Sequence, residues 1–286
     1  MALLLKGKDV AAAITERSRR DTEALKAAGV TPTLAILRVG EKDSDLSYER
    51  GAVKRCAEAG VEVRSVALPE DAGAEEFYGA LDALNKDSGV HGILMFRPLP
   101  AALDNEKARL AIAPEKDVDG CTDASLCGVF TGRQTGFAPC TAQAVIEMLD
   151  YYGIGIEGKR AVVLGRSLVV GRPAAMMLMA RGATVTVCHT KTKDAAALAR
   201  GAEILVTATG QTETVGAAYA APAGQVIIDV GISWSEAKGK LCGDCVFEEL
   251  EPLAAAITPV PGGVGAVTTS VLVSHVIEAA KRGAGR

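Results

Sequence analysis

The sequence predicts an α/β protein with two domains, in which helices cover parallel sheets. The chain has 286 residues, which is enough for two hydrophobic cores. Strand-like and helix-like segments alternate along its first third, the pattern of a parallel sheet whose crossover connections are helices. A strand, a glycine turn, a helix and a second strand follow in the middle of the chain. Nearly half of the residues are apolar and few are aromatic, as expected of Ala- and Gly-rich helices on such a sheet.

The first third contains three predicted strands and three predicted helices. Each strand is a short run of apolar and β-branched residues, and two of the helices end at a glycine, which favours helix termination. We expect helices over residues 8–28, 45–59 and 74–85 and strands over residues 33–39, 61–66 and 92–96.

Residues 160–173, with the sequence RAVVLGRSLVVGRP, carry the most information about function. Ala161–Leu164 predicts a buried strand that ends at Gly165. Pro173 suits the first turn of a helix, and helix-forming residues follow it. A glycine turn before a helix N-terminus presents free backbone N–H groups and the positive end of the helix dipole, so it predicts an anion site. With a strand over residues 183–187, this is a β-α-β unit that can hold a dinucleotide.

The rest of the predicted second domain continues the same pattern. A helix is expected before the glycine turn, two more strands after it and a helix at the end of the chain. These elements cover residues 142–152, 203–210, 225–231 and 268–282.

The residues around the glycine turn favour one cofactor. Five residues separate Gly165 from Gly171, unlike the G-x-G-x-x-G pattern, so the spacing alone leaves an ordinary tight turn open. An NAD site usually has Asp or Glu after the second strand, but the sequence there is CHTKT. Arg166, Thr190 and Lys191 suit an additional phosphate, so we expect NADP.

Charge and hydropathy argue against several classes of partner. The net charge is −4 and basic residues form no stripe, so a nucleic-acid partner is not expected. Residues 1–6 contain too short an apolar run for a signal peptide. The longest apolar region, residues 168–187, is interrupted by Arg172 and Arg181, so no membrane span is expected. The cytoplasm is the default location.

Seven scattered cysteines argue against a disulfide framework. Cys242 and Cys245 form a C-x-x-C pair, which leaves a zinc or redox role open, but no second pair provides the other two zinc ligands. We therefore expect reduced thiols and no metal. His91, His189 and His275 are far apart in sequence, and we interpret each as a structural histidine rather than a metal ligand.

Residues 257–265, with the sequence ITPVPGGVG, predict a loop with one rigid backbone path. Prolines restrict it, and glycines allow close approach of another group. A rigid turn between domains is the alternative interpretation.

Four separated motifs follow one another along the chain: Pro114–Gly120, Pro139–Thr141, Gly165–Pro173 and Ile257–Gly265. In this combination the chain resembles the methylenetetrahydrofolate dehydrogenase/cyclohydrolase family over essentially its whole length.

The resemblance implies two α/β domains with the active cleft between them. Residues 1–139 and 268–286 would form a catalytic, folate-binding domain, to which the C-terminal helix returns. Residues 140–267 would form a Rossmann-type NADP-binding domain. The resemblance further implies tetrahydrofolate derivatives as partners and a homodimer.

The family's dehydrogenase oxidises 5,10-methylenetetrahydrofolate to the methenyl cation, and its cyclohydrolase converts this cation to 10-formyltetrahydrofolate. By resemblance, Tyr48 packs on the folate, Asp119 binds the pterin edge and Asp117 lies near the reacting carbon; these three form the catalytic set. Further substrate contacts would come from Leu99, Pro261, Gly262, Gly263 and Val264. The cofactor contacts would come from Gly165, Arg166, Ser167, Gly171, His189, Thr190, Lys191 and Thr209.

The chain departs from the family at two linked positions. Members that hydrolyse the methenyl cation carry a lysine four residues after the tyrosine, where this chain has Ala52, and a glutamine where it has Phe96. Lys54 is close in sequence but lies on another face of a helix. We therefore expect a dehydrogenase whose cyclohydrolase activity is weak or absent.

Three alternatives remain open from the sequence. The chain could be a bifunctional dehydrogenase/cyclohydrolase or a degenerate folate-binding regulator. Another Rossmann dehydrogenase, of the amino-acid or shikimate kind, would explain the nucleotide unit but not Asp117, Asp119 and the 257–265 loop.

Overall fold

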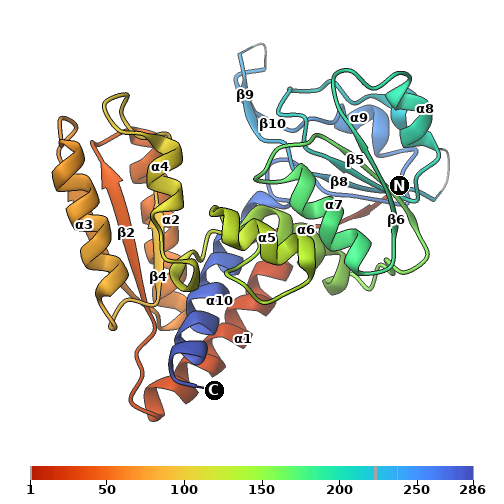
Figure 1. Cartoon of the computed structure of the whole chain (residues 1–286). Coiled ribbons are helices and arrows are strands. Elements are labelled where there is room, and N and C mark those ends of the chain that lie inside the picture. The colour runs from red at the N-terminus through yellow and green to blue at the C-terminus, as the bar shows by residue number, and fades with distance from the viewer. Residues whose placement is uncertain (1, 222–223, 237, 286) are drawn as a thin grey trace. The chain divides into compact units, whose positions relative to one another are not determined.

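The computed structural model describes residues 2–221, 224–236 and 238–285, which form two compact units (Figure 1). The six-stranded unit comprises Met1–Ala11 and Thr141–Thr268, and the three-stranded unit comprises Ala12–Cys140 and Thr269–Arg286. Helices α1 (Gly7–Ala27) and α10 (Gly265–Gly283) contribute residues to both units. Each unit is built on a parallel sheet, so the predicted two-domain α/β class is confirmed.

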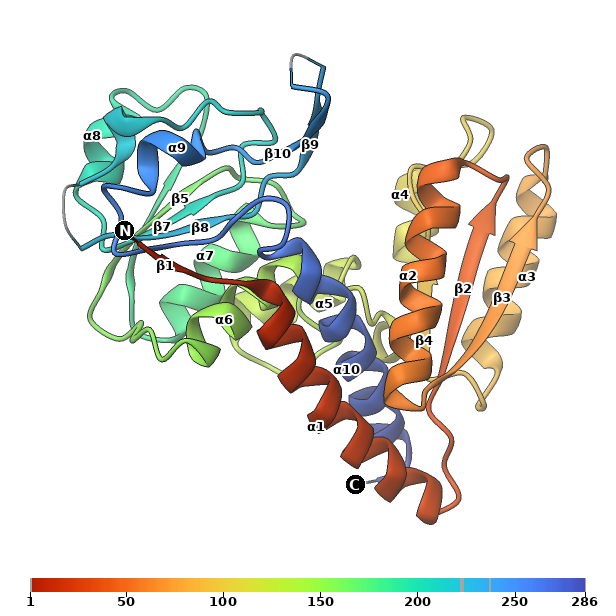
Figure 2. The same cartoon turned by 180° about the vertical axis from the view of Figure 1, so that it is seen from behind.

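The six-stranded unit has helices on both faces of its sheet. Its elements are β1 (Leu3–Leu4), α6 (Cys140–Tyr151), β5 (Arg160–Leu164), α7 (Gly171–Ala180), β6 (Thr184–Cys188), α8 (Ala195–Arg200), β7 (Ile204–Thr207), η2 (Ala217–Tyr219), β8 (Val226–Asp229), β9 (Ser233–Ser235), β10 (Lys240–Cys242), α9 (Phe247–Leu250) and β11 (Ala256–Ile257). The strand order is β1-β11-β8-β7-β5-β6, with every pair parallel. Helices α6 and α7 lie on one face and α8 and α9 on the other (Figures 1 and 2), so the central strands are buried almost throughout.

The three-stranded unit has a smaller parallel sheet with strand order β3-β2-β4. Besides α1 and α10, its elements are β2 (Thr33–Val39), α2 (Asp43–Ala59), β3 (Glu62–Leu68), α3 (Ala74–Lys86), β4 (Gly92–Met95), α4 (Asn105–Leu110), η1 (Pro114–Lys116) and α5 (Asp123–Thr131). β2 is buried along its length because it pairs on both sides, whereas the edge strand β3 is largely exposed. Helices α1 and α10 lie side by side in both views (Figures 1 and 2).

The N-terminal residues pair differently from the expectation. The sequence placed all of residues 1–139 in one domain, but β1 pairs in parallel with β11 and extends the sheet of the six-stranded unit. The first eleven residues therefore group with the predicted nucleotide domain. A two-residue strand contains too few side chains to show a period, so its sequence could not reveal this pairing.

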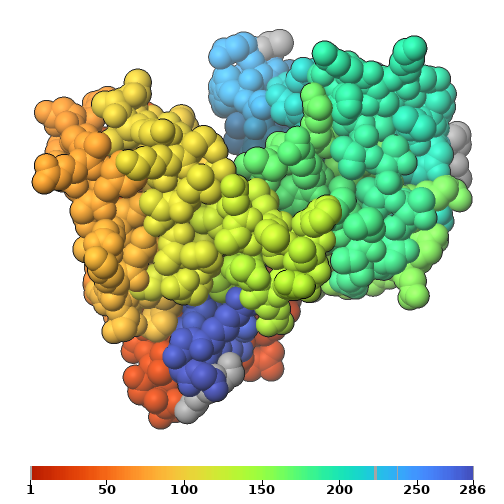
Figure 3. Space-filling view, viewed as in Figure 1, coloured from red at the N-terminus to blue at the C-terminus, as the bar shows by residue number. Residues whose placement is uncertain are grey.

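Several short elements were absent from the sequence prediction, and all of them have nine residues or fewer. The β9–β10 hairpin protrudes from the surface of its unit (Figure 3) and exposes Trp234. The predicted long elements are present, with ends that differ by up to three residues. Within the described part of the chain, no helix has both the length and the apolar character that crossing a membrane requires. The elements that the prediction missed are β1, α4, η1, α5, α8, η2, β9, β10, α9 and β11.

Candidate active site

One pocket of about 350 Å³ in the six-stranded unit gathers most of the predicted cofactor residues. It lies where the loops that follow the parallel strands β5, β6 and β7 meet, the usual ligand position in an open α/β sheet. Its volume is within the range of small-molecule sites. Of the eight predicted residues, Gly171 and Lys191 do not line the pocket, and the other six do: Gly165, Arg166, Ser167, His189, Thr190 and Thr209.

The glycine turn is packed so closely that only glycine fits at two positions. Gly165 has φ 128°, and a Cβ there would lie 2.1 Å from the Ala208 carbonyl oxygen. A Cβ on Gly171 would lie 2.2 Å from the Gly165 carbonyl oxygen. The Ser167 hydroxyl accepts hydrogen bonds from the Val170 and Gly171 N–H groups at 3.1 and 3.4 Å. Gly171 therefore serves the turn by packing behind it, which accounts for the unusual five-residue spacing.

A buried carboxylate holds the pocket loop that follows β7. Asp244 is 1% exposed and accepts hydrogen bonds from the Thr209 and Gly210 N–H groups. Asp229, at the end of β8, in turn accepts from the Asp244 N–H at 3.1 Å and the Cys245 N–H at 2.9 Å. This pocket thus rests on hydrogen bonds between backbone N–H groups and two buried carboxylates. The sequence patterns did not indicate either carboxylate.

The C-x-x-C segment belongs to this network. Cys242 and Cys245 are both buried, and burial raises the pKa of the Cys245 thiol, with the charge of Asp229 adding to the effect. A thiol that stays protonated is a poor nucleophile and a poor metal ligand. Across residues 2–221, 224–236 and 238–285, no group of three or more His, Cys, Asp or Glu side chains could hold a metal ion.

Arg166, in the loop after β5, places a cation at the pocket, and the loop after β6 adds polar groups but no carboxylate. The His189 ring nitrogen Nδ1 accepts a hydrogen bond from the Lys191 N–H at 3.1 Å, which fixes the turn. The side chains of Arg166 and Thr190 are exposed and line the pocket, whereas Lys191 is exposed beside it. Among the described residues, none that lines this pocket is acidic.

The remaining lining residues were missed from the sequence. Ala195, Val215 and Tyr219 provide an apolar wall from α8, η2 and the loop before η2, and these short segments carry no periodic signal. Gln211 and Thr214 add polar groups from the loop that follows β7.

The proline- and glycine-rich loop connects β11 to α10 in the six-stranded unit. Gly7 donates its N–H to the Gly262 carbonyl oxygen at 2.8 Å, and a Cβ on Gly7 would lie 2.0 Å from the Gly263 oxygen. The close approach that the glycines allow is therefore made by the start of α1. Pro261 and Gly262 are exposed, whereas Gly263 and Val264 are buried. These four predicted folate residues thus belong to a different unit from Tyr48, Asp117 and Asp119.

Asp117 organises a loop in the three-stranded unit. Its side chain is 0% exposed and accepts hydrogen bonds from the Cys121 N–H at 2.9 Å, the Thr122 N–H at 2.7 Å and the Ser125 hydroxyl at 2.6 Å. Thr122 caps α5 through the Ser125 N–H. Both oxygens of Asp117 are thus occupied by the loop that they hold, and its predicted role near the reacting carbon stays a prediction.

Asp119 is only partly buried and carries an unusual pKa. Burial raises the pKa of this carboxyl group to about 6, and the negative charge of Asp117 contributes in the same direction. The charge of Arg97 and a hydrogen bond with the Cys140 thiol oppose the shift. Partners within the chain do not fully offset the burial of this charge, so the carboxylate can accept hydrogen bonds from a ligand.

Tyr48, which is on α2, lies near Asp119. Its side chain is 39% exposed, and its ring meets the Phe96 ring edge-on with 5.8 Å between centroids. Burial raises the pKa of the Tyr48 hydroxyl, with the charge of Asp119 adding to the effect and a hydrogen bond with Thr269 opposing it. The Tyr48 hydroxyl is therefore enclosed, although the residue as a whole is partly exposed.

The two substituted positions carry apolar side chains that both adjoin Tyr48, and together we call them the apolar wall. Ala52, one helical turn after Tyr48, is 0% exposed, and Phe96 is 8% exposed. Lys54 is exposed, as its place on the helix predicted. Leu99 is 5% exposed within the apolar core of the unit, and its predicted substrate contact stays a prediction.

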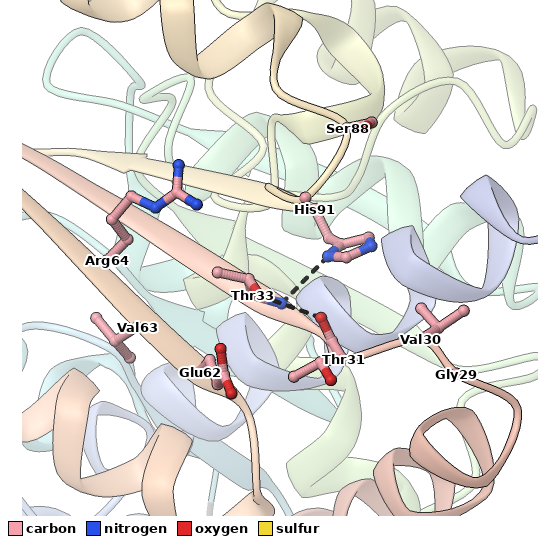
Figure 4. Close-up of a pocket in the computed structure, with 10 residues that line it drawn as sticks. Gly29, Val30, Thr31, Thr33, Glu62, Val63, Arg64, Ser88 and His91 are labelled. Carbon is pink, nitrogen blue, oxygen red and sulfur yellow. Dashed lines mark hydrogen bonds between the residues drawn. The ribbon is translucent and has the colours of Figure 1, made fainter.

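A second hollow, of about 570 Å³, lies at the amino ends of β2, β3 and β4 in the three-stranded unit (Figure 4). His91 turns its Nδ1 toward the Thr33 N–H, 3.2 Å away, and Arg64 is paired with Asp87. The hollow lies at the opposite strand ends from Phe96 and is separate from the predicted site.

Two family models match the chain in succession. The catalytic domain of tetrahydrofolate dehydrogenase/cyclohydrolase matches residues 5–119, and the NAD(P)-binding domain of the same family matches residues 139–284. Matches to both domains rule out a different Rossmann dehydrogenase.

Full-length relatives agree with these matches. The bifunctional protein FolD of Alkaliphilus oremlandii is 47% identical over 281 residues, with 98% of each chain covered. The crystal structure of the bifunctional FolD enzyme from Campylobacter jejuni has a TM-score of 0.94 at 37% identity and covers 99% of both chains. FolD from Trypanosoma brucei, solved with NADP cofactor and an inhibitor, has a TM-score of 0.91 at 35% identity, covering 100% of this chain and 99% of that one. The chain therefore belongs to the tetrahydrofolate dehydrogenase/cyclohydrolase family.

Proposed function

We propose that this protein is an NADP-dependent 5,10-methylenetetrahydrofolate dehydrogenase with weak or absent cyclohydrolase activity. Family membership supports the oxidation of methylenetetrahydrofolate. The observation that carries the finer part is the apolar wall of Ala52 and Phe96, which lies against Tyr48.

The cofactor pocket fits NADP in its shape and charge. Gly165 has no Cβ atom, and its turn packs so closely that a Cβ would clash there. A phosphate chain could therefore approach the backbone of this turn closely. Arg166 and Thr190 would hold the additional phosphate, and Asp244 would keep the Thr209 loop in place. When bound, NADP supplies the hydride acceptor, while the chain binds and orients the folate.

Asp119 is the proposed pterin anchor. The amino and ring N–H donors of a pterin suit a bidentate carboxylate, and Asp119 is the less occupied of the two loop carboxylates. Asp117 remains in the proposed site as the residue that positions the loop. Tyr48 would offer its ring face to the folate.

The two activities place different demands on the protein. Hydride loss is driven by the folate nitrogen lone pair, so it depends mainly on positioning. Water addition to the methenyl cation needs a group that removes a proton, and such a group contributes about a hundredfold or more. A methyl group and a phenyl ring cannot transfer a proton, so Ala52 and Phe96 support loss of the second step.

The test follows both steps with purified protein. It should reduce NADP in the presence of methylenetetrahydrofolate, and methenyltetrahydrofolate should accumulate. Added enzyme should leave the spontaneous decay of methenyltetrahydrofolate absorbance unchanged. Rapid enzyme-dependent decay would contradict the proposal and favour a bifunctional enzyme. Absence of NADP reduction would instead favour a folate-binding regulator.

A rescue experiment isolates the two positions. Ala52→Lys alone would place an ammonium against Phe96, where burial lowers the pKa of a lysine and can misplace it. The double variant Ala52→Lys with Phe96→Gln should therefore gain more hydrolysis than the single one. Lys54→Ala is the matched control, because this exposed lysine lies on another face of α2, and its removal should change neither activity.

Two further parts of the proposal concern the oligomeric state and the cellular location. A homodimer follows from the family resemblance and is checked by sedimentation of the purified chain. A cytoplasmic location agrees with seven free cysteines in the structure.

A further inference from the structure

We propose that His275 is a positioning residue for Asp119, acting through the peptide bond that joins Val118 to Asp119. His275 lies on α10, 157 positions along the chain from Val118, and its Nδ1 is 2.9 Å from the Val118 carbonyl oxygen. This inference rests on the proposed function in one respect, because it takes Asp119 as the pterin anchor.

The contact determines the tautomer of the imidazole. A carbonyl oxygen only accepts, so Nδ1 must carry the hydrogen. Burial lowers the pKa of His275 to about 4, although the bond to Val118 opposes this, so the ring is neutral at pH 7. The second ring nitrogen then carries no hydrogen. His275 is thus a neutral donor with one defined orientation.

Aromatic packing holds the ring in that orientation. Phe137 lies 5.0 Å from the His275 ring between centroids, at 32° between planes. The Arg282 guanidinium covers Phe137 at 4.5 Å and donates to the Gly136 carbonyl oxygen at 3.0 Å. The imidazole is therefore fixed by packing as well as by its hydrogen bond.

The Val118 carbonyl receives a second donor from another segment. The Cys140 thiol lies 3.2 Å from the same oxygen, and the Cys140 N–H donates to the Asp119 carbonyl oxygen at 3.4 Å. Burial raises the pKa of Cys140 well above its usual value, so the thiol remains a donor. The peptides on both sides of Asp119 are thereby held, so its carboxylate, which also has a hydrogen bond with the Cys140 thiol, is attached to a fixed backbone.

Positioning of Asp119 by His275 should strengthen binding of the pterin. The pterin anchor must meet two donors at once, so a small rotation of the Val118–Asp119 peptide would misalign both hydrogen bonds. Loss of the His275 donor leaves the Val118 oxygen with the weaker thiol donor alone. Binding of the pterin should then weaken, while binding of NADP in the six-stranded unit should not change.

The test compares three substitutions by calorimetric titration with tetrahydrofolate and, separately, with NADP. His275→Phe keeps the stacked ring and removes the donor, and it should raise the Kd for tetrahydrofolate about fivefold or more without changing that for NADP. His275→Asn keeps a donor near the Nδ1 position and should restore binding to within about twofold. His91→Phe is the matched control, a half-buried histidine of the same unit that contacts the Thr33 backbone, and it should leave both Kd values unchanged.

A double-variant cycle shows whether His275 acts through Asp119. In an Asp119→Ala background, His275→Phe should have little further effect on tetrahydrofolate binding, because the group that it positions is gone. Fully additive effects would overturn the inference, and so would a His275→Phe variant that binds tetrahydrofolate as tightly as the unsubstituted protein. If His275→Phe does not fold, His275→Gln replaces it, and equal binding by the Asn and Gln variants and the unsubstituted protein would also overturn the inference.

Two further measurements separate this inference from the proposed function. Nitrogen-15 NMR of the imidazole should show the hydrogen on Nδ1 at pH 7, and a hydrogen on the other nitrogen would overturn the inference. Turnover is followed independently with methylenetetrahydrofolate and NADP. A protein that binds tetrahydrofolate in the expected His275-dependent way without turnover would overturn the dehydrogenase and leave the role of His275 intact.

Discussion

The cofactor pocket and the surroundings of Asp119 are built in different ways. The pocket is lined by the loops that follow β5, β6 and β7 and by α8 and η2, and in its glycine turn a closely packed backbone and strand ends come together. The Asp119 site combines side chains from α2, the end of β4, the Asp117 loop, the start of α6 and α10. The first site depends mainly on glycines that lack a Cβ atom, with Asp244 holding one of its loops, and the second depends mainly on hydrogen bonds between distant segments.

This difference predicts different consequences of substitution. A backbone site should fail abruptly when a Cβ is added and should tolerate changes of exposed side chains. A side-chain site should lose affinity in steps, and its buried charges should cost stability. The predictions below test this contrast, from the largest expected effect to the smallest.

Gly165→Ala should have the largest effect. The added Cβ would lie 2.1 Å from the Ala208 oxygen at a backbone φ of 128°, so the turn must move. We expect a loss of about 3 kcal/mol or more in the free energy of unfolding. NADP binding should fall by about a hundredfold, as measured by titration.

Gly153→Ala provides the matched control in the same unit. Its φ is 66°, but no heavy atom lies within 4 Å of the added Cβ. It should cost about 1–2 kcal/mol from backbone strain alone and leave NADP affinity unchanged. Equal losses of NADP affinity in the two variants would contradict a backbone-built pocket.

Asp119→Asn should weaken folate binding by roughly tenfold, because the amide presents a donor to one N–H of the pterin. The same change should stabilise the protein at high pH. The pKa of Asp119 is raised to about 6, so the folded state favours the protonated form. The contribution of this group to stability is present below about pH 4 and is lost as the pH rises toward 6.

At pH 8 the unsubstituted protein carries the full cost of the ionised carboxylate, about 1–2 kcal/mol after allowance for its partial exposure. Urea unfolding at pH 8 should show this gain for Asp119→Asn, and the gain should nearly vanish at pH 4. A destabilised variant at pH 8 would show that partners within the chain compensate the carboxylate. Asp117→Asn is the contrast, since it disturbs three hydrogen bonds and should destabilise the protein.

Arg166→Ala should change the preference between cofactors. A charge-assisted contact with the additional phosphate would be lost, so the KM for NADP should rise about tenfold while that for NAD stays within about twofold. Steady-state kinetics with both cofactors measures the ratio. An equal rise for both would remove Arg166 from the phosphate site.

The same contrast explains how far the sequence could predict the molecule. The β5–α7–β6 unit was predictable because its strands, glycines and helix start are adjacent in sequence. Asp119 was identified only through the family resemblance. His275 is a single histidine in an apolar helix, and nothing local indicates a partner 157 positions away. The two-residue strand β1 likewise depends on a distant partner, β11.

Lys191→Ala should have the smallest effect and tests the edge of the cofactor pocket. The Lys191 N–H is bound to His189, so the backbone is fixed, but the exposed side chain does not line the pocket. Its ammonium would act on the additional phosphate through solvent, where screening leaves an interaction of well under 1 kcal/mol. We expect the KM for NADP to rise about twofold at low salt and the difference to disappear near 0.5 M salt, because the Debye length is then shorter than the separation of the charges. A tenfold effect that persists at high salt would mean that Lys191 contacts the phosphate directly, and the pocket would then extend beyond the residues that line it in the structure.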